Sequence, residues 1–375
     1  MKLNYKVQNI LPILFSIFSL ATLLPSCSKE PIRETPVDPE PVDTTPVATT
    51  YDHGVFIINE GNFNWGNASV TFIDDSKKTA IQDIYKKAND RSLGDVAQSM
   101  KVVGNKGYIV VNNSNRVEVV NLKDFKSIKS IDGFYSPRYL EIVDNNKAYV
   151  TNLQHDISII DLSTNTVKGT ISTNSWTENM ILYKNYMFVT SVGAFSQPNS
   201  DRNAQIYVIS TKEDRIIDSI QTGKEPLGIV IDKKEKLWVL CTGGFDNYEA
   251  PSLVRINPEL RMVEKAFVFP TGGGAPSRLC INPSGDTIYF LKGGVYQMPV
   301  TSSAIPDQPF ISSTGQLFYG LAVHPQNGTV YVSDAIDYVQ NGKVMQFNPA
   351  TGKKMAEYQT GRIPGSFSFT VTGLK

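Results

Sequence analysis

The chain has 375 residues, of which 41% are hydrophobic, 10% aromatic and 19% charged, a balance that excludes disorder along its whole length. Lysine plus arginine and aspartate plus glutamate each number 36, so the net charge is 0 at pH 7. A nucleic-acid groove needs a basic surplus, and we therefore expect no nucleic-acid partner. Three histidines and three cysteines are too few for most metal-rich or disulfide-stapled proteins. We expect no cofactor and assign no metal ligands; the alternative is a metal site assembled from Asp, Glu and Asn on different strands of the fold.

The N-terminus has the pattern of a bacterial lipoprotein signal peptide. Lys2 and Lys6 precede a mostly apolar run over residues 10–24, and Ser26 stands directly before Cys27. The sequence predicts a signal peptide over residues 1–26, with Cys27 lipidated. The alternative is a transmembrane anchor, but a spanning helix needs roughly 20 apolar residues and this run is shorter.

Residues 27–50 have the composition of an extended spacer. Five prolines and seven charged residues fall within residues 28–50, a content that disfavours a packed core. The segment Ser28-Lys29-Glu30 resembles in part the charged export signal of surface lipoproteins in Bacteroides-like bacteria. We therefore expect a protein that is lipid-anchored at the outer membrane and exposed on the cell surface, with its folded part over residues 51–375.

The folded part repeats one pattern of four short strands. The clearest unit covers strands at residues 137–142, 147–152, 156–162 and 166–171, separated by Asn, Asp and Ser turns. Equivalent first strands begin near seven positions, 40 to 50 residues apart. These are Ala97, Pro137, Thr177, Pro226, Pro276, Phe318 and Pro364. Such a period predicts an all-β, seven-bladed β-propeller of four-stranded blades.

The two ends of the repeat predict how the ring closes. The strand from Pro364 has no second strand after it, and the first blade, from Val55, lacks an innermost strand. The C-terminal strand should therefore complete the N-terminal blade and remove the open edges. Two separate β domains are the alternative, but no change of composition marks a linker between them. Helical periodicity is limited to residues 83–89, where we expect a short helix.

One face of this propeller carries the longer loops. Connections before first strands and between second and third strands share a face, which we call the long-loop face; turns between first and second strands, such as residues 144–146, lie on the other face. Extra length on one face is typical of a ligand-binding face in a repeat fold, and aromatic and amide side chains provide its contacts. The candidate ligand-binding residues are Asn62, Phe63, Trp65, Asn67, Gln98, Tyr135, Arg138, His155, Trp176, Glu178, Asn179, Phe195, Phe245, Tyr248, Arg278, Tyr319 and Tyr338.

Other chemistry is weakly indicated. His324 precedes a proline in a short turn and is expected to be a turn residue, and no histidine pair has metal-ligand spacing. Asp334 and Asp337 could bind a cation or be ordinary loop acids. Cys241 and Cys280 fall on strands of consecutive blades, where they either form a disulfide or remain free and buried.

The opening of the folded part resembles a known family. Val55 to Asn62 reads VFIINEGN and is followed by Asn67-Ala68-Ser69-Val70, and together with the lipoprotein N-terminus and seven blades it is similar to the YncE-like propeller lipoproteins of Bacteroidetes. One branch of that group, the BtuG-type proteins, captures cobalamin (vitamin B12) and passes it to BtuB, a TonB-dependent outer-membrane transporter. The resemblance implies a ligand over the channel mouth on the long-loop face, with cobalamin as cargo and not as cofactor.

Three functions remain open from the sequence. The first is a binding protein for a scavenged nutrient, with cobalamin the leading candidate. The second is a propeller that interacts with a protein or glycan. The third is a propeller lactonase or lyase, in which His155, Glu178 and Arg278 would act as acid, base or orienting groups.

Overall fold

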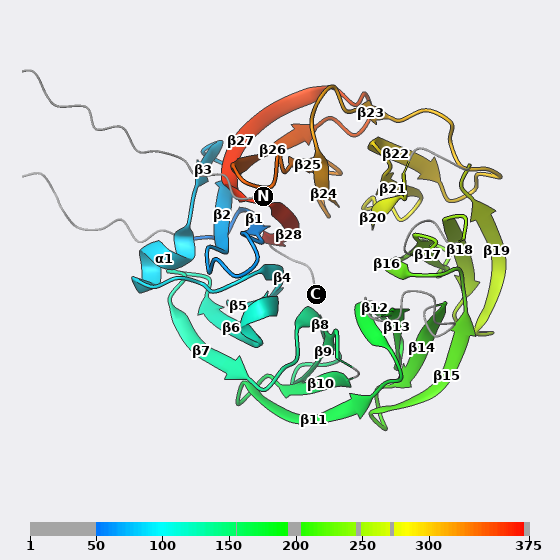
Figure 1. Cartoon of the computed structure of the whole chain (residues 1–375), viewed down its shortest axis with the longest axis horizontal. Helices are drawn as coiled ribbons and strands as arrows, with labels where there is room; N and C mark the ends of the chain where they lie inside the picture. The colour runs from blue at the N-terminus through cyan, green and yellow to red at the C-terminus, as the bar shows by residue number, and fades with distance from the viewer. Residues whose placement is uncertain (1–49, 155, 194–203, 245–248, 271–273, 371–375) are drawn as a thin grey trace, which may run out of the picture. The chain divides into compact units, whose positions relative to one another are not determined.

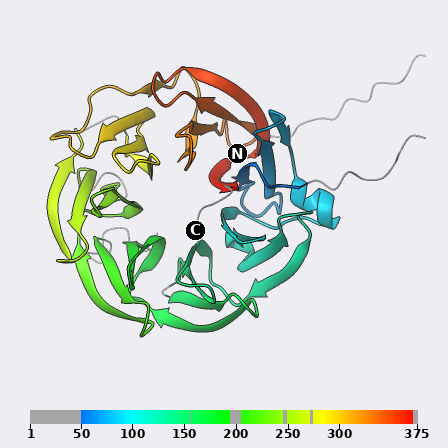
Figure 2. The same ribbon diagram turned by 180° about the vertical axis from the view of Figure 1, so that it is seen from behind.

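A computed structural model describes residues 50–154, 156–193, 204–244, 249–270 and 274–370. They form seven sheets of four antiparallel strands, each strand hydrogen-bonded to its neighbours. Figure 1 shows the sheets arranged around one central axis, and Figure 2 shows the same ring from behind. The predicted all-β, seven-bladed propeller is therefore confirmed.

The first four blades are given from the innermost strand outward. Blade 1 contains β28 (Pro364–Thr370), β1 (Gly54–Asn59), β2 (Ser69–Asp74) and β3 (Thr79–Ile81); blade 2 contains β4 (Ala97–Val103), β5 (Lys106–Val111), β6 (Arg116–Asn121) and β7 (Ser127–Asp132); blade 3 contains β8 (Pro137–Ile142), β9 (Lys147–Asn152), β10 (Asp156–Asp161) and β11 (Thr166–Ser172); blade 4 contains β12 (Trp176–Tyr183), β13 (Tyr186–Val192), β14 (Gln205–Ser210) and β15 (Arg215–Gln221).

Three further blades complete the ring. Blade 5 contains β16 (Pro226–Ile231), β17 (Leu237–Cys241), β18 (Ser252–Asn257) and β19 (Met262–Val268); blade 6 contains β20 (Ser277–Ile281), β21 (Thr287–Leu291), β22 (Gly294–Pro299) and β23 (Ile311–Ser312); blade 7 contains β24 (Phe318–Val323), β25 (Val330–Asp334), β26 (Asn341–Phe347) and β27 (Lys354–Arg362). The seven predicted first strands each begin within one residue of the predicted position. The short helix is α1 (Ile84–Asn89), and a 3-10 turn, η1 (Asn112–Ser114), follows β5.

Strand β28 closes the ring as the sequence predicts. It pairs antiparallel with β1, with Gly54 opposite Thr370 and Ile58 opposite Ser366. The Gly54 N–H donates to Thr370 Oγ1 at 2.9 Å, and that hydroxyl donates back to the Gly54 carbonyl at 3.1 Å. Blade 1 is thus built from both ends of the folded segment, and β1 has a hydrogen-bonded neighbour on each side.

The core lies between the blades because both faces of each middle strand are covered by a neighbouring sheet. Strands β1 and β2 are buried along their whole length, whereas the outer strand β11 alternates between exposed and covered residues. Between blades 1 and 2, an aromatic cluster of Tyr51, Phe56, Phe72 and Phe125 has ring centroids 5.0 to 6.1 Å apart. The alternation that predicted the strands is therefore the pattern of inter-blade packing.

The two faces differ in loop length, with exceptions to the prediction on each face. On the long-loop face, residues 60–68 join β1 to β2 and residues 335–340 join β25 to β26, while on the other face residues 184–185 suffice between β12 and β13. On the long-loop face residues 292–293 alone join β21 to β22, and on the face predicted to have short turns residues 300–310 form a long connection between β22 and β23. It is long because β23 has only two residues in the ladder. Among the residues that the structure describes, no helix has the length and apolar character needed to cross a membrane.

Candidate functional site at the channel mouth

All seven innermost strands carry a bulge just after their first or second residue, at the long-loop end of the channel. In blade 2, Ala97 pairs with Val111 and Ser99 with Val110, which leaves Gln98 without an opposite residue. A bulge turns the extra side chain away from the sheet, here toward the axis. The first bulged residue of each blade is, in ring order from blade 2, Gln98, Arg138, Glu178, Leu227, Arg278, Tyr319 and Gly365.

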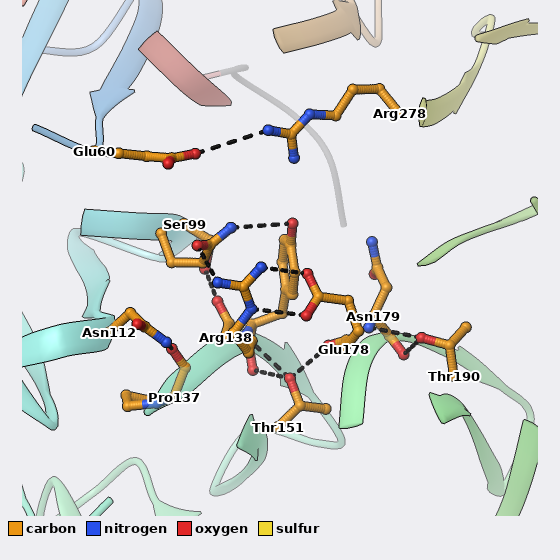
Figure 3. Close-up of polar contacts among 12 residues, drawn as sticks. Glu60, Ser99, Asn112, Pro137, Arg138, Thr151, Glu178, Asn179, Thr190 and Arg278 are labelled. Carbon is orange, nitrogen blue, oxygen red and sulfur yellow. Dashed lines mark hydrogen bonds and ion pairs between the residues drawn. The ribbon is translucent and has the colours of Figure 1, made fainter. Parts of the chain in front are cut away.

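Hydroxyl groups on the second strands hold the wider bulges open. In blade 3, Tyr139 N–H donates to Thr151 Oγ1 at 3.1 Å, and the same hydroxyl donates to the carbonyl of Glu178 in blade 4 at 2.6 Å. In blade 4, Asn179 N–H donates to Thr190 Oγ1 at 2.8 Å. These side chains replace the ladder bonds that a bulge removes, so the backbone around the mouth stays satisfied (Figure 3).

Each guanidinium nitrogen of Arg138 donates a hydrogen bond to a neighbour in the ring. Its Nε and Nη2 donate to the two carboxylate oxygens of Glu178, both at 2.7 Å, and its Nη1 donates to Gln98 Oε1. The pair is mostly buried, since the side chains of Arg138 and Glu178 are 20% and 9% exposed. Bidentate geometry of this kind fixes both groups in one orientation. It also occupies both oxygens of Glu178.

A second charged group faces this pair across the mouth. Figure 3 shows Glu60 and Arg278 directed at each other on the side opposite Arg138 and Glu178. Glu60 Oε1 lies 3.7 Å from Arg278 Nη2, and Tyr319 donates its hydroxyl to the same carboxylate at 2.9 and 3.0 Å. The Arg278 guanidinium lies over the Tyr319 ring, 4.9 Å from its centroid. Two arginines and two glutamates thus balance in charge around the channel.

Burial shifts the pKa values of these groups. Burial raises the pKa of the Glu60 carboxyl, although Arg278 and the Tyr319 hydroxyl act in the opposite direction. Burial and the Glu60 charge raise the pKa of Tyr319 far above its usual range, so its hydroxyl remains a donor. Burial lowers the pKa of Arg138, but the Glu178 carboxylate outweighs it and the net shift is upward. Arg138 is therefore a cation at neutral pH.

These groups line an open cavity of about 720 Å³ at the channel mouth. Its lining has a charged part and an apolar part, and the apolar part comes mainly from blades 5 to 7 and from β28. The apolar lining includes Leu227, Leu279, Phe318, Leu321 and Phe367. Tyr139 and Asn179 also line a second cavity of about 540 Å³ further along the channel. A cavity with one polar and one apolar side suits an amphipathic small molecule.

A family model described as a domain of unknown function, DUF5074, matches residues 53–367. The chain belongs to the DUF5074 family. The match begins just before β1 and ends within β28, the strand that closes the ring, so the family domain covers all seven blades. A search of curated proteins found no match.

Solved structures similar to this DUF5074 chain show its fold alone, because their sequence identities are low. A quinonprotein alcohol dehydrogenase-like protein from Bacteroides thetaiotaomicron has a TM-score of 0.66 and 19% identity over 86% of this chain and 79% of that one. The dihydro-heme d1 dehydrogenase NirN has a TM-score of 0.58 and 10% identity over 88% and 78%. The hydrazine synthase of Kuenenia stuttgartiensis has a TM-score of 0.55 and 14% identity over 72% of this chain and 88% of that one.

The structure brings seven of the predicted site residues into the cavity lining and places others around it. Those in the lining are Arg138, Trp176, Glu178, Asn179, Arg278, Tyr319 and Tyr338, and Gln98 lies behind Arg138. Asn62, Phe63, Trp65, Asn67 and Tyr135 do not line it and form the rim of the long-loop face. His155, Phe195, Phe245 and Tyr248, like the predicted lipidation site Cys27, lie outside the described residues.

Phe63 and Trp65 are held outward by the residue between them. The Asn64 N–H donates to Asp95 Oδ2 at 2.8 Å, and Asn64 Oδ1 accepts from Asn113 at 3.1 Å. This fixes the loop on blade 2 and leaves Phe63 65% and Trp65 76% exposed. These rings therefore face solvent at the rim and not the cavity.

Sequence reasoning did not single out Glu60, Leu227, Phe318 and Phe367. Glu60 enters the ring from the β1–β2 loop, because blade 1 has Gly365 at its own bulge. A Cβ at Gly365 would lie 2.2 Å from Glu60 Oε1. The signal in the sequence was an acidic residue directly after a buried strand, combined with a glycine at the equivalent position of the closing strand.

The weaker chemical candidates have structural roles in the described residues. Asp334 accepts the backbone N–H groups of Leu317 and Ile336, and Asp337 accepts those of Val339 and Gln340. No cluster of potential metal ligands occurs within the described ranges.

His324 and the two strand cysteines are likewise structural. His324 is a buried turn residue whose Nδ1 accepts from Gln326 N–H at 3.2 Å. Cys241 and Cys280 are both free, so the alternative of a disulfide between them is not realised.

Proposed function

We propose that this protein binds a small organic nutrient at the channel mouth of its propeller. The observation that carries the proposal is the 720 Å³ open cavity, whose walls combine fixed charges with aromatic and aliphatic surface. Arg138, Glu178, Arg278 and Tyr319 are each held by hydrogen bonds within the protein, so little ordering is needed on binding. A preformed concave site with few convergent polar groups is the usual form of a small-molecule site.

Cobalamin is the first ligand that we propose. It is broad, nearly flat and rimmed with amides, and it needs a wide, open concavity with aromatic and hydrogen-bonding partners. Trp176, Tyr319 and Tyr338 supply aromatic surface at the mouth, and Asn179 supplies an amide. The resemblance of the opening segment to the YncE-like lipoproteins supports the same ligand.

The place of the protein in the cell is part of the same proposal. The signal-peptide pattern ending at Cys27 and the proline-rich residues 28–50 support a lipid-anchored protein on the surface of the outer membrane. A surface binding protein is useful when it passes its cargo to a transporter. We propose that this partner is a TonB-dependent transporter of the BtuB type.

The test is binding of cyanocobalamin to residues 27–375 carrying Cys27→Ala, which removes the predicted lipid. We expect the red chromophore to co-elute with the protein on a sizing column in a stoichiometric amount. Trp176→Ala at the mouth should weaken co-elution, and Trp65→Ala at the rim should not, provided that both variants keep the wild-type melting temperature. No co-elution with the wild type would rule out cobalamin as the ligand.

A second candidate function rests on the rim. Phe63, Trp65 and Tyr135 are 65%, 76% and 59% exposed, and exposed aromatic residues on one face are typical of protein or glycan contacts. Capture of a protein or glycan that is abolished by Trp65→Ala and unaffected by Trp176→Ala would favour this function over nutrient binding.

Catalysis is less well supported by the geometry. Both oxygens of Glu178 accept hydrogen bonds from Arg138, so this carboxylate is not poised as a general base. The cavity lining contains no histidine or cysteine among the residues that the structure describes. Turnover of a lactone that is lost on Glu178→Gln while binding persists would reverse this preference.

A further inference from the structure

We propose that Arg278 is the recognition site for an anionic group of the ligand, a carboxylate, sulfonate or phosphate attached to an apolar or aromatic body. The inference rests on the proposed function in using the same cavity, but not on cobalamin being the ligand. It is carried by the contrast between the two arginines of the mouth.

Arg278 has two guanidinium nitrogens without an acceptor among the described residues, whereas each guanidinium nitrogen of Arg138 donates to one. Arg138 uses Nε, Nη1 and Nη2 on Gln98 and Glu178. Arg278 donates from Nε to the Tyr319 carbonyl at 3.0 Å, and its Nη2 lies 3.7 Å from Glu60, beyond hydrogen-bond distance. Within the described residues its Nη1 and Nη2 therefore have no hydrogen-bond acceptor, although a guanidinium carries five N–H donors.

The position of this guanidinium is fixed by the backbone and by a ring. Arg278 is the bulged residue of β20 and has a φ of 51°, a left-handed conformation that is rare for such a side chain. Its guanidinium lies over the Tyr319 ring. A strained backbone that aims a stacked, oriented cation into a cavity is preorganised for a planar anion.

The surroundings of Arg278 suit an amphipathic anion and not a free inorganic ion. Leu227 and Leu279 line the cavity beside it, and Leu321 and Phe318 line it on blade 7. These side chains would cover the apolar body of a ligand whose anionic group pairs with Nη1 and Nη2. Glu60 balances the charge of Arg278 until the ligand binds, which avoids an isolated charge in a partly buried site.

The experiment compares two fluorescent probes that share an apolar body. Anilinonaphthalene sulfonate carries a sulfonate, and phenylnaphthylamine has the same rings without it. Each is titrated into residues 27–375 carrying Cys27→Ala, and into the same chain with Arg278→Gln. We expect Arg278→Gln to lower the affinity for the sulfonate probe by at least about tenfold, because a charge-assisted pair is lost. The affinity for the neutral probe should stay the same.

Three controls separate this inference from a general loss of structure. Arg215→Gln removes an exposed arginine on the outer strand β15, and Trp65→Ala removes the most exposed rim aromatic; neither should change either affinity. Arg278→Lys should restore part of the affinity for the sulfonate probe.

Several outcomes would overturn the inference. One is that the wild type fails to bind the sulfonate probe, and another is that Arg278→Gln binds that probe as tightly as the wild type does. The others are that Arg278→Gln loses affinity for both probes equally, or that Trp65→Ala weakens the binding of the sulfonate probe. A failure of cyanocobalamin to bind would leave this result intact and would point to another anionic ligand.

Discussion

At the scale of single residues, the mouth depends on a glycine as much as on its charged groups. Gly365 occupies the one bulge of the ring that lacks a side chain, and Glu60 fills the space from a neighbouring loop. Tyr319 then fixes Glu60 from blade 7. A single absent Cβ therefore lets two distant parts of the sequence share one position.

Gly365→Ala tests this arrangement. The new Cβ would lie 2.2 Å from Glu60 Oε1 and 2.9 Å from its Cδ, so the carboxylate must leave Tyr319. We expect a loss of about 1–3 kcal/mol in the free energy of unfolding, as for other overpacked sites, measured by urea denaturation. The control is Gly169→Ala on the outer strand β11, where the nearest atom is 3.9 Å away. An equal effect of both substitutions would contradict the role given to Gly365.

The site could be predicted from the sequence only where side chains follow the strand repeat. Arg138, Glu178 and Arg278 were found because each stands at the start of a first strand. Glu60 was missed because its place depends on the pairing of β28 with β1, a contact across the whole folded segment. Aromatic composition does not show which way a loop is fixed, so the sequence could not show that Phe63 and Trp65 lie outside the cavity lining.

At the scale of secondary-structure elements, the recurrent bulge determines the site. A regular inner strand would direct its side chains into the neighbouring blades, whereas the bulge presents one residue per blade to the axis. Bulges leave no mark in the alternation of a six-residue strand, so the sequence predicted the strands without them. The hydroxyl residues opposite the wider bulges, Thr151, Thr190 and Ser333, are their local signature.

Thr151→Val tests the bulge at constant side-chain shape. The substitution removes the acceptor for Tyr139 N–H and the donor to the Glu178 carbonyl, both at a buried position. We expect a loss of about 1–3 kcal/mol in the free energy of unfolding and weaker ligand binding, because Arg138 and Glu178 flank this link. The matched control is Thr170→Val on β11, an exposed position, for which we expect little change. A neutral Thr151→Val would show that the bulge does not depend on this hydroxyl.

At the scale of the whole molecule, the ring was predictable because similar turn residues recur in successive blades. Turns after the third strands use side-chain acceptors: Asp161 accepts the N–H groups of Ser163 and Thr164, and Asn348 accepts those of Ala350 and Thr351. Each turn can be recognised by itself, and regular spacing gave the number of blades. Closure by β28 followed from counting strands.

Aspartates in the turns of the blades predict how stability depends on pH. Hydrogen bonds from Lys168, Ser163 and Thr164 lower the pKa of Asp161, and those from Asn282, Lys233 and Ser284 lower the pKa of Asp286. A depressed pKa gives stability that is present above the unfolded value of about 4 and is lost as the pH falls. We expect Asp161→Asn to flatten the acid side of a plot of urea midpoint against pH. Asn348→Asp, at the matching turn of blade 7, should steepen it; the reverse order would contradict this account.

The central claim is that a small ligand binds in the cavity at the channel mouth. A substitution that fills this cavity with a larger side chain tests the claim most directly. Leu227→Trp places a larger side chain into the cavity without removing any charged group of the ring, and Ile128→Trp on the exposed outer strand β7 is the control. Cyanocobalamin affinity is measured by equilibrium dialysis for both variants and the wild type. The account predicts a loss of at least about tenfold, or 1.4 kcal/mol, for Leu227→Trp and none for Ile128→Trp. Unchanged binding by a folded Leu227→Trp would contradict it.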